Sequence, residues 1–173
     1  LHGFDAGTAG VRVGDIEVEA IPFGLQPTGT IDGPVVYVEQ PDVLKYSTGA
    51  FDGTIVLAYG RASGLHDLLS ETEIRAYIAI SSPHRGATSL SHRQKRFEEK
   101  LAIPCLTVSY DDGKKLISAI HDGADAATVS VEQTVERRSA HNIVVSLGQP
   151  VLDENIVYLV AHYDSVARSH GST

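Results

Sequence analysis

The sequence predicts an α+β fold in which a β-sheet curls around its own core. Two observations predict it. Between residues 15 and 136, short apolar segments bounded by glycine or proline outnumber segments with helical spacing. Hydrophobic residues make up 42% of the 173-residue chain, and charged residues make up 21%. That balance is typical of a globular protein that can bury a core.

The expected strands are rich in β-branched residues and end at turn-forming residues. Residues 1–14 contain four glycines and are expected to form a connecting segment. Residues 22–34, also rich in glycine and proline, are expected to form a loop with a short edge strand. The strands that the pattern predicts lie at residues 15–20, 35–39, 53–60, 75–81, 103–109, 126–136, 140–147 and 156–161.

Two segments have helical spacing. Residues 63–74 place leucines on one face, with Ser63 as the candidate N-cap. Residues 111–121 begin acidic and continue basic, and Gly123 is expected to end that helix. Residues 91–101 are expected to form a short charged helix or an exposed loop.

Composition excludes some classes of function. The chain has 14 basic and 22 acidic residues, a formal net charge of −8, which argues against a nucleic-acid surface. The basic cluster at 92–96 is followed by Glu98 and Glu99, as on a solvated helix face. No run approaches transmembrane length, so we expect no membrane span. Cys105 is the single cysteine and lies in an apolar strand, so a buried, inert thiol is expected.

The last predicted strand, residues 156–161, is apolar throughout, as in a parallel sheet buried on both faces. His162 and Asp164 follow at its carboxyl end, where open α/β sheets bind ligands. They are two residues apart and so point the same way in an extended segment. A metal-ligating histidine usually donates its other ring N–H to a carboxylate. The alternative is a strand-end histidine followed by a capping or turn aspartate, and the pattern alone leaves both open.

The string VAHYDSV, followed by a Ser-His-Gly-Ser-Thr loop, resembles the first zinc-ligand motif of the M28 family of zinc aminopeptidases. The resemblance implies that His162 is a zinc ligand, that Asp164 orients it, and that two zinc ions serve the hydrolysis of N-terminal residues from peptides. By the family pattern, the bridging aspartate would follow Thr173, with the remaining ligands and the catalytic glutamate further on. The chain begins at Leu1 and contains no methionine, so we expect a fragment.

Residues 15–136 resemble a protease-associated (PA) domain, a module that many M28 peptidases carry inserted into the catalytic domain. The likeness rests on residues 53–59, 75–81 and 103–120, in that order. Residues 137–145 resemble the segment that re-enters the catalytic domain, although His141 adds a residue to that pattern. The expected organisation is a linker at 1–14, a PA domain at 15–136 with a curled sheet or barrel, and the first strands of an α/β zinc-peptidase domain, truncated, at 137–173.

The resemblance leaves two functions open. The chain is either a fragment of a zinc-dependent aminopeptidase, in which the PA domain shapes substrate access, or a non-catalytic PA module that binds a protein partner. A peptide substrate is the expected partner of the first, and the family resemblance favours a secreted or cell-surface protein. A serine hydrolase built on Ser165 is disfavoured because no Gly-x-Ser-x-Gly elbow is present.

Other candidates have simpler interpretations. His170 is either an extra zinc ligand or an exposed loop histidine. Asp111 and Asp112 are adjacent carboxylates, but at a helix start they are expected to be cap and first-turn charges. Three further histidines are expected to lie on the surface: His66, His84 and His92. His121 is expected to lie at a helix end.

Overall fold

A computed structural model describes residues 2–4, 7–47, 49–61, 64–83, 100–137 and 143–144. Within these residues, seven strands form a closed barrel in the order β2-β3-β7-β6-β5-β4-β8. Closure pairs every strand on both sides, so the barrel presents no free sheet edge. The barrel strands are β2 (Thr8–Val13), β3 (Ile16–Pro22), β4 (Gly29–Val38), β5 (Ile55–Tyr59), β6 (Ala76–Ile80), β7 (Cys105–Val108) and β8 (Ala126–Glu132).

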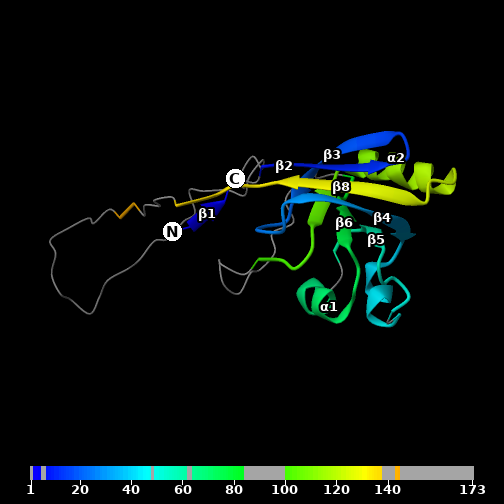
Figure 1. Cartoon of the computed structure of the whole chain (residues 1–173), viewed down its shortest axis with the longest axis horizontal. Helices are drawn as coiled ribbons and strands as arrows, with labels where there is room; N and C mark the ends of the chain where they lie inside the picture. The colour runs from blue at the N-terminus through cyan, green and yellow to red at the C-terminus, as the bar shows by residue number, and fades with distance from the viewer. Residues whose placement is uncertain are drawn as a thin grey trace.

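The barrel is mixed in direction. Strands β4, β5, β6 and β7 run parallel to one another, while β2, β3 and β8 complete the wall through antiparallel pairs. A separate ribbon pairs β1 (His2–Phe4) with β9 (Val135–Arg137). In Figure 1, β1 projects beyond one end of the barrel and the helix α2 (Tyr110–His121) lies near the other end.

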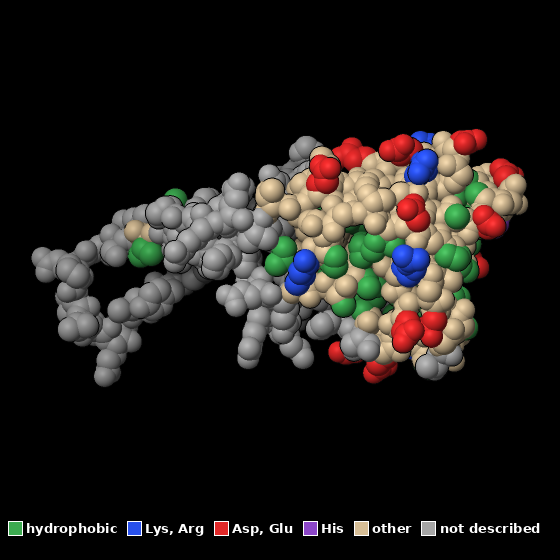
Figure 2. All heavy atoms as spheres, in the orientation of Figure 1, with side chains coloured by type: hydrophobic (Ala, Val, Ile, Leu, Met, Phe, Trp, Pro, Cys, Tyr) green, Lys and Arg blue, Asp and Glu red, His purple; other side chains and the backbone are tan. Residues whose placement is uncertain are grey.

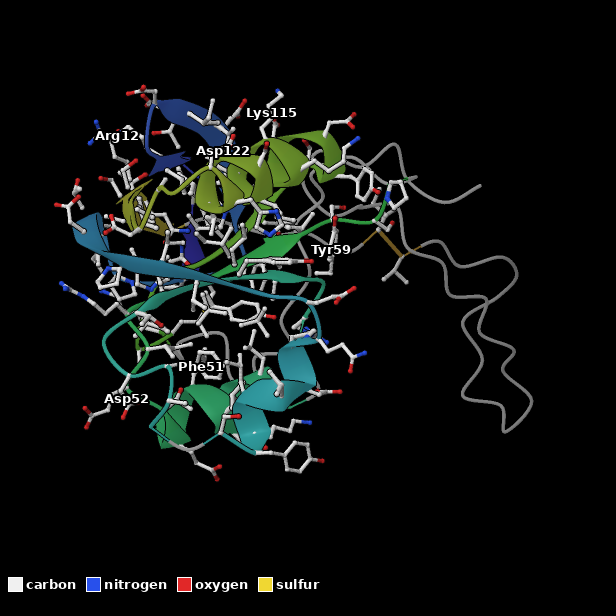
Figure 3. All side chains as sticks on the ribbon, turned by 90° about the vertical axis from the view of Figure 1, so that its right-hand side faces the viewer. Arg12, Phe51, Asp52, Tyr59, Lys115 and Asp122 are labelled. Carbon is white, nitrogen blue, oxygen red and sulfur yellow. The ribbon has the colours of Figure 1, made fainter. Side chains whose placement is uncertain are left out.

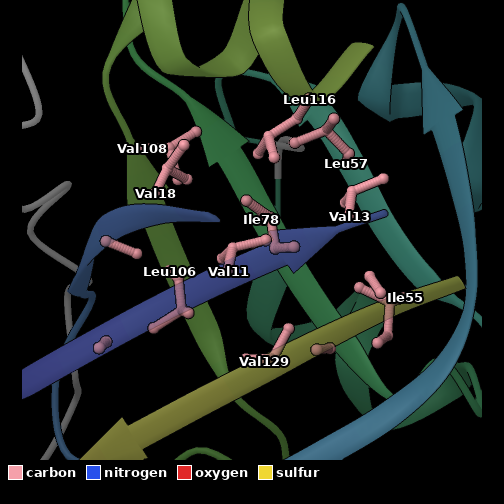
Figure 4. Close-up of a cluster of buried hydrophobic side chains, with 14 of the residues drawn as sticks. Val11, Val13, Val18, Ile55, Leu57, Ile78, Leu106, Val108, Leu116 and Val129 are labelled. Carbon is pink, nitrogen blue, oxygen red and sulfur yellow. The ribbon is translucent and has the colours of Figure 1, made fainter. Parts of the chain in front are cut away.

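The core has two parts because the parallel strands are buried on both faces. Aliphatic side chains from alternate positions fill the barrel interior, and Leu116 of α2 joins them (Figure 4). The outer face of β5 and β6 packs against α1 (Leu65–Glu71) and the short helix η1 (Pro41–Lys45). The alternation predicted for half-buried strands is therefore visible in β2 and β8, whereas β5 and β6 are apolar throughout.

Helix α2 ends as the sequence indicates, but its N-cap is Ser109 and not an aspartate. The Ser109 hydroxyl caps it, accepting a hydrogen bond from the Asp112 N–H at 3.1 Å. At the other end Gly123 adopts a φ of 104°, and its N–H donates to the Ile120 carbonyl at 3.1 Å. The Ala124 N–H donates to the Ala119 carbonyl at 3.0 Å, which completes a Schellman motif. The prediction for Gly123 is confirmed.

Three expectations about the strands are wrong. The segment 1–14, expected to be a linker, contains a barrel strand, β2, whose Val11 and Val13 are fully buried. The loop expected at 22–34 becomes strand from Gly29, where β4 pairs with β8. The strand expected at 126–136 is divided into β8 and β9. In the first two cases long-range pairing overrides the local glycine and proline signal.

The first helix is shorter than expected. Its N-cap is Gly64, in a left-handed conformation with φ of 66°, whereas Ser63 lies outside the described residues. The strand expected at 156–161 also lies outside them, as do the strand expected at 140–147, apart from residues 143 and 144, and most of the segment 91–101. No described helix has both the length and the apolar character needed to cross a membrane.

Acidic side chains dominate the surface of this domain. Figure 2 shows Asp and Glu side chains along the upper and lower edges of one face, with fewer Lys and Arg side chains among them. Short-range ion pairs lie on this surface between Lys45 and Asp42, Lys114 and Asp111, and Lys115 and Asp112. This surface agrees with the net charge of −8.

Candidate functional site

The residues predicted to hold zinc lie outside the described part of the chain. These residues are His162 and Asp164. Four other candidates also lie outside the described part: His84, His92, Ser165 and His170. Among the described residues, no group of three or more His, Cys, Asp or Glu side chains is placed to hold a metal ion. The described barrel therefore supplies no zinc site of its own, and the zinc prediction at His162 stays a prediction.

Two sequence interpretations can be checked directly. Cys105 is free and fully buried, so the buried thiol that the sequence predicts is confirmed. This burial raises the pKa of the thiol far above its usual range, which disfavours the reactive thiolate. Asp111 and Asp112 lie in the first turn of α2, where each carboxylate pairs with a lysine three residues on. The structure confirms first-turn charges, although the cap itself is Ser109.

The environment of Asp112 favours its ionised form. Its carboxylate accepts a hydrogen bond from the Lys115 ammonium at 2.7 Å and another from the Ser109 hydroxyl at 2.7 Å. The bond from Lys115, and then that from Ser109, lower the pKa of Asp112 below its usual value. A carboxylate held ionised and paired at a helix start stabilises the helix and is poorly suited to act as an acid or base.

A shallow groove of about 520 Å³ lies at the end of the barrel where β8 leads toward β9. Hydroxyl groups of threonine and serine dominate its lining, together with the side chains of Glu132 and Gln133. Glu132 accepts a hydrogen bond from the Thr8 hydroxyl at 3.2 Å. The described lining contains no histidine or cysteine, so it offers polar contacts and no nucleophile–base pair.

Beside this groove, two glutamines join three segments. The Gln133 side chain accepts a hydrogen bond from the Gln26 N–H at 3.2 Å and donates one to the Gly24 carbonyl at 2.9 Å. The fully buried Gln26 side chain in turn accepts a hydrogen bond from the Cys105 N–H at 2.9 Å. We call these two residues the glutamine clamp. It fixes the connection between β8 and β9 to the loop after β3 and to the start of β7.

At the other end of the barrel, three aromatic side chains gather beside α2. Tyr37 of β4 and Tyr59 of β5 form an edge-to-face pair with ring centroids 6.1 Å apart, and the ring of Tyr110 lies 6.1 Å from that of Tyr59. We call these residues the tyrosine cluster. The His121 ring lies 6.4 Å from Tyr37. In Figure 3, Tyr59 lies just below α2, on the opposite side of the view from Arg12.

Burial and neighbouring charge act on the tyrosine cluster. Burial is the main cause that raises the pKa of Tyr37 and of Tyr59. The negative charge of Glu39 adds to the rise in pKa at both residues, because it disfavours the ionised form of each phenol. The Lys114 ammonium lies 4.9 Å from the centroid of the Tyr110 ring, within the range of a cation–π contact.

This cluster was not predicted from the sequence, although the positions of its tyrosines contain a signal for it. Tyr37 and Tyr59 lie at the carboxyl ends of β4 and β5, and Tyr110 opens the helix that follows β7. Each therefore follows an apolar segment at the end of the parallel sheet where ligands of α/β folds bind. The described residues thus place a polar groove at one end of the barrel and the tyrosine cluster at the other.

No protein-family model matches the chain, and no curated protein matches it significantly. Several solved structures do match the chain. An aminopeptidase from Aneurinibacillus sp. strain AM-1 matches with a TM-score of 0.54 and 17% identity, over 78% of this chain and 33% of that one. A zinc aminopeptidase from Bacillus subtilis matches in two structures, with TM-scores of 0.51 and 0.50 and identities of 12% and 14%.

Both Bacillus subtilis matches cover 78% of this chain, and 35% and 32% of the aminopeptidase. The chain therefore spans about a third of the length of the aminopeptidases it resembles. At these identities the likeness is one of fold. The mixed barrel with few helices has the fold of part of these enzymes.

Proposed function

We propose that this chain is part of an M28-type zinc aminopeptidase, which removes N-terminal residues from peptides. Residues 15–136 would be its PA domain, extended by β2, and residues 137–173 would begin its catalytic domain. One observation carries the proposal. A barrel with the fold of part of zinc aminopeptidases precedes, in the same chain, a strand-like segment that ends in His162 and Asp164.

The course of the chain supports an inserted domain. Strand β1 pairs with β9 antiparallel, with His2 opposite Arg137 and Phe4 opposite Val135. The chain therefore enters and leaves the barrel at one place, as a module inserted into another domain must. A barrel attached through one ribbon can lie over a neighbouring active site and limit which peptides reach it.

In this proposal, His162 would hold zinc and Asp164 would accept the hydrogen bond from its other ring nitrogen, fixing the tautomer and orientation of the imidazole. Bound zinc supplies an activated water and polarises the substrate carbonyl. The described barrel residues offer no such ligand set. Their part is to position the domain and to contact the substrate or a partner.

The test uses the full-length protein, its bound zinc and its hydrolysis of aminoacyl-p-nitroanilides. We expect His162→Ala to abolish activity and to lower the zinc content. Asp164→Asn should lower activity or zinc affinity by about 10- to 100-fold, since it weakens the orienting hydrogen bond. His66→Ala is the control, because it removes a histidine of α1 in the barrel domain and should leave both unchanged. Full activity and full zinc content in His162→Ala would refute the assignment.

The second candidate function is a non-catalytic interaction module, and the tyrosine cluster favours it. Tyrosine is enriched where proteins bind partners, because its ring is apolar and its hydroxyl polar. The same experiment separates the two functions. A full-length protein that holds no zinc and hydrolyses no peptide, while remaining folded, would support the interaction module and exclude the peptidase.

A further inference from the structure

The tyrosine cluster has the composition of a cation-binding surface. Its rings come from β4, β5 and α2, and all three side chains are half-buried at the boundary between the helix and the strands. The barrel interior beneath them is filled by aliphatic residues, including Leu57 and Leu116. The three rings pack against this end of the core, and the Tyr59 and Tyr110 side chains are hydrogen-bonded to each other.

A cation already contacts the cluster. The Lys114 ammonium lies over the Tyr110 ring at 4.9 Å, while it also pairs with Asp111 at 2.9 Å. Tyr37 and Tyr59 form an edge-to-face pair in the same group of rings. The exposed Glu39 follows Tyr37 by two residues, and its negative charge adds to the rise in pKa at both tyrosines. Aromatic faces next to a carboxylate attract cationic side chains.

The charge of the whole chain favours the same kind of ligand. Its formal net charge is −8, with 14 basic and 22 acidic residues. Such a field attracts basic partners and repels acidic ones. We propose that the tyrosine cluster, together with Glu39, binds a lysine or arginine side chain presented by a partner protein. This interaction is independent of the proposed peptidase activity.

The test measures binding of a fluorescein-labelled peptide of alternating lysine and glycine to the full-length protein by fluorescence anisotropy. We expect Tyr59→Leu to weaken binding about tenfold or more, because the ring face is lost. Tyr59→Phe should bind within about twofold of the wild type, because a phenyl face still attracts a cation. Tyr46→Leu is the matched control, since Tyr46 is 84% exposed and follows η1, outside the cluster.

A second pair of variants separates local charge from net charge. Glu39→Gln and Glu73→Gln each remove one exposed carboxylate, but Glu39 follows the carboxyl end of β4, whereas Glu73 precedes the amino end of β6. We expect Glu39→Gln to weaken binding severalfold more than Glu73→Gln. Circular dichroism and thermal unfolding establish that each variant is folded before its affinity is compared.

Two outcomes would overturn the proposal. One is equal binding by the Tyr59→Leu and Tyr46→Leu variants, which would show that the basic peptide responds to net charge alone. The other is the absence of binding at low salt to the folded wild-type protein. Neither outcome depends on zinc or on peptidase activity. The aminopeptidase proposal can therefore fail while cation binding by the tyrosine cluster is upheld, and cation binding can fail while the aminopeptidase proposal is upheld.

Discussion

A methyl group on Gly113 of α2 would lie only 2.5 Å from Cγ2 of Ile80, the last residue of β6. Ile80 is 1% exposed and Gly113 is buried, so neither can move away cheaply. Glycine inside a helix costs about 1 kcal/mol relative to alanine. Here that cost allows α2 to approach the end of the barrel closely enough for Leu116 to enter the core.

We therefore predict that Gly113→Ala lowers the free energy of unfolding by about 1–3 kcal/mol, the usual cost of overpacking a core. Urea denaturation measures it. The double variant with Ile80→Ala is the control, because removing the Ile80 side chain removes the collision. The loss in the double variant should be smaller than the sum of the two single losses. Stabilisation by Gly113→Ala would show that α2 does not need this close approach.

The strands and the second helix follow from local patterns. The apolar segments at 53–60, 75–81 and 103–109 become β5, β6 and β7, because each is long enough to cross the barrel and apolar on both faces. The capping signals of α2 were also local. Local signals failed where the partner is distant in sequence. The glycines of residues 1–14 suggested a linker, yet β2 lies within this segment and β8 pairs with it along its whole length.

The candidate sites were less predictable than the fold. The His162 motif depends on two residues and a family resemblance, and it lies outside the described residues. The tyrosine cluster unites β4, β5 and α2, which become neighbours only when the barrel closes. The glutamine clamp is invisible in the sequence for the same reason, since Gln26 and Gln133 meet across 107 positions.

Stability should depend on pH through Asp112. Its pKa lies below the ordinary value of 3.8 in the folded protein, so its ionised form favours the folded state. This contribution is present above the ordinary pKa and is lost as the pH falls through the lower, folded-state pKa. We predict that the stability advantage of the wild type over Asp112→Asn, measured by urea denaturation, is constant near neutral pH and decreases below about pH 4.

Ser109→Ala serves as the control for this pH dependence. It removes the hydroxyl that donates to the Asp112 carboxylate at 2.7 Å and caps the helix. The loss of the cap should cost about 1 kcal/mol at neutral pH. In the Ser109→Ala background, the further loss of stability caused by Asp112→Asn should be smaller, because one of the two hydrogen bonds that stabilise the carboxylate is already absent. Parallel pH profiles for the wild type and Asp112→Asn would contradict the assignment.

The glutamine clamp should control access to Cys105. We predict that Gln133→Leu lowers the free energy of unfolding by about 1–3 kcal/mol, because it removes the hydrogen-bond partners of the Gly24 carbonyl and the Gln26 N–H. Weakening the clamp should also speed the reaction of the buried Cys105 thiol with a disulfide reagent, since local opening exposes it. Thr134→Val, an exposed neighbour, is the control and should change neither quantity. A thiol reaction rate unchanged by Gln133→Leu would show that the start of β7 stays closed without the clamp.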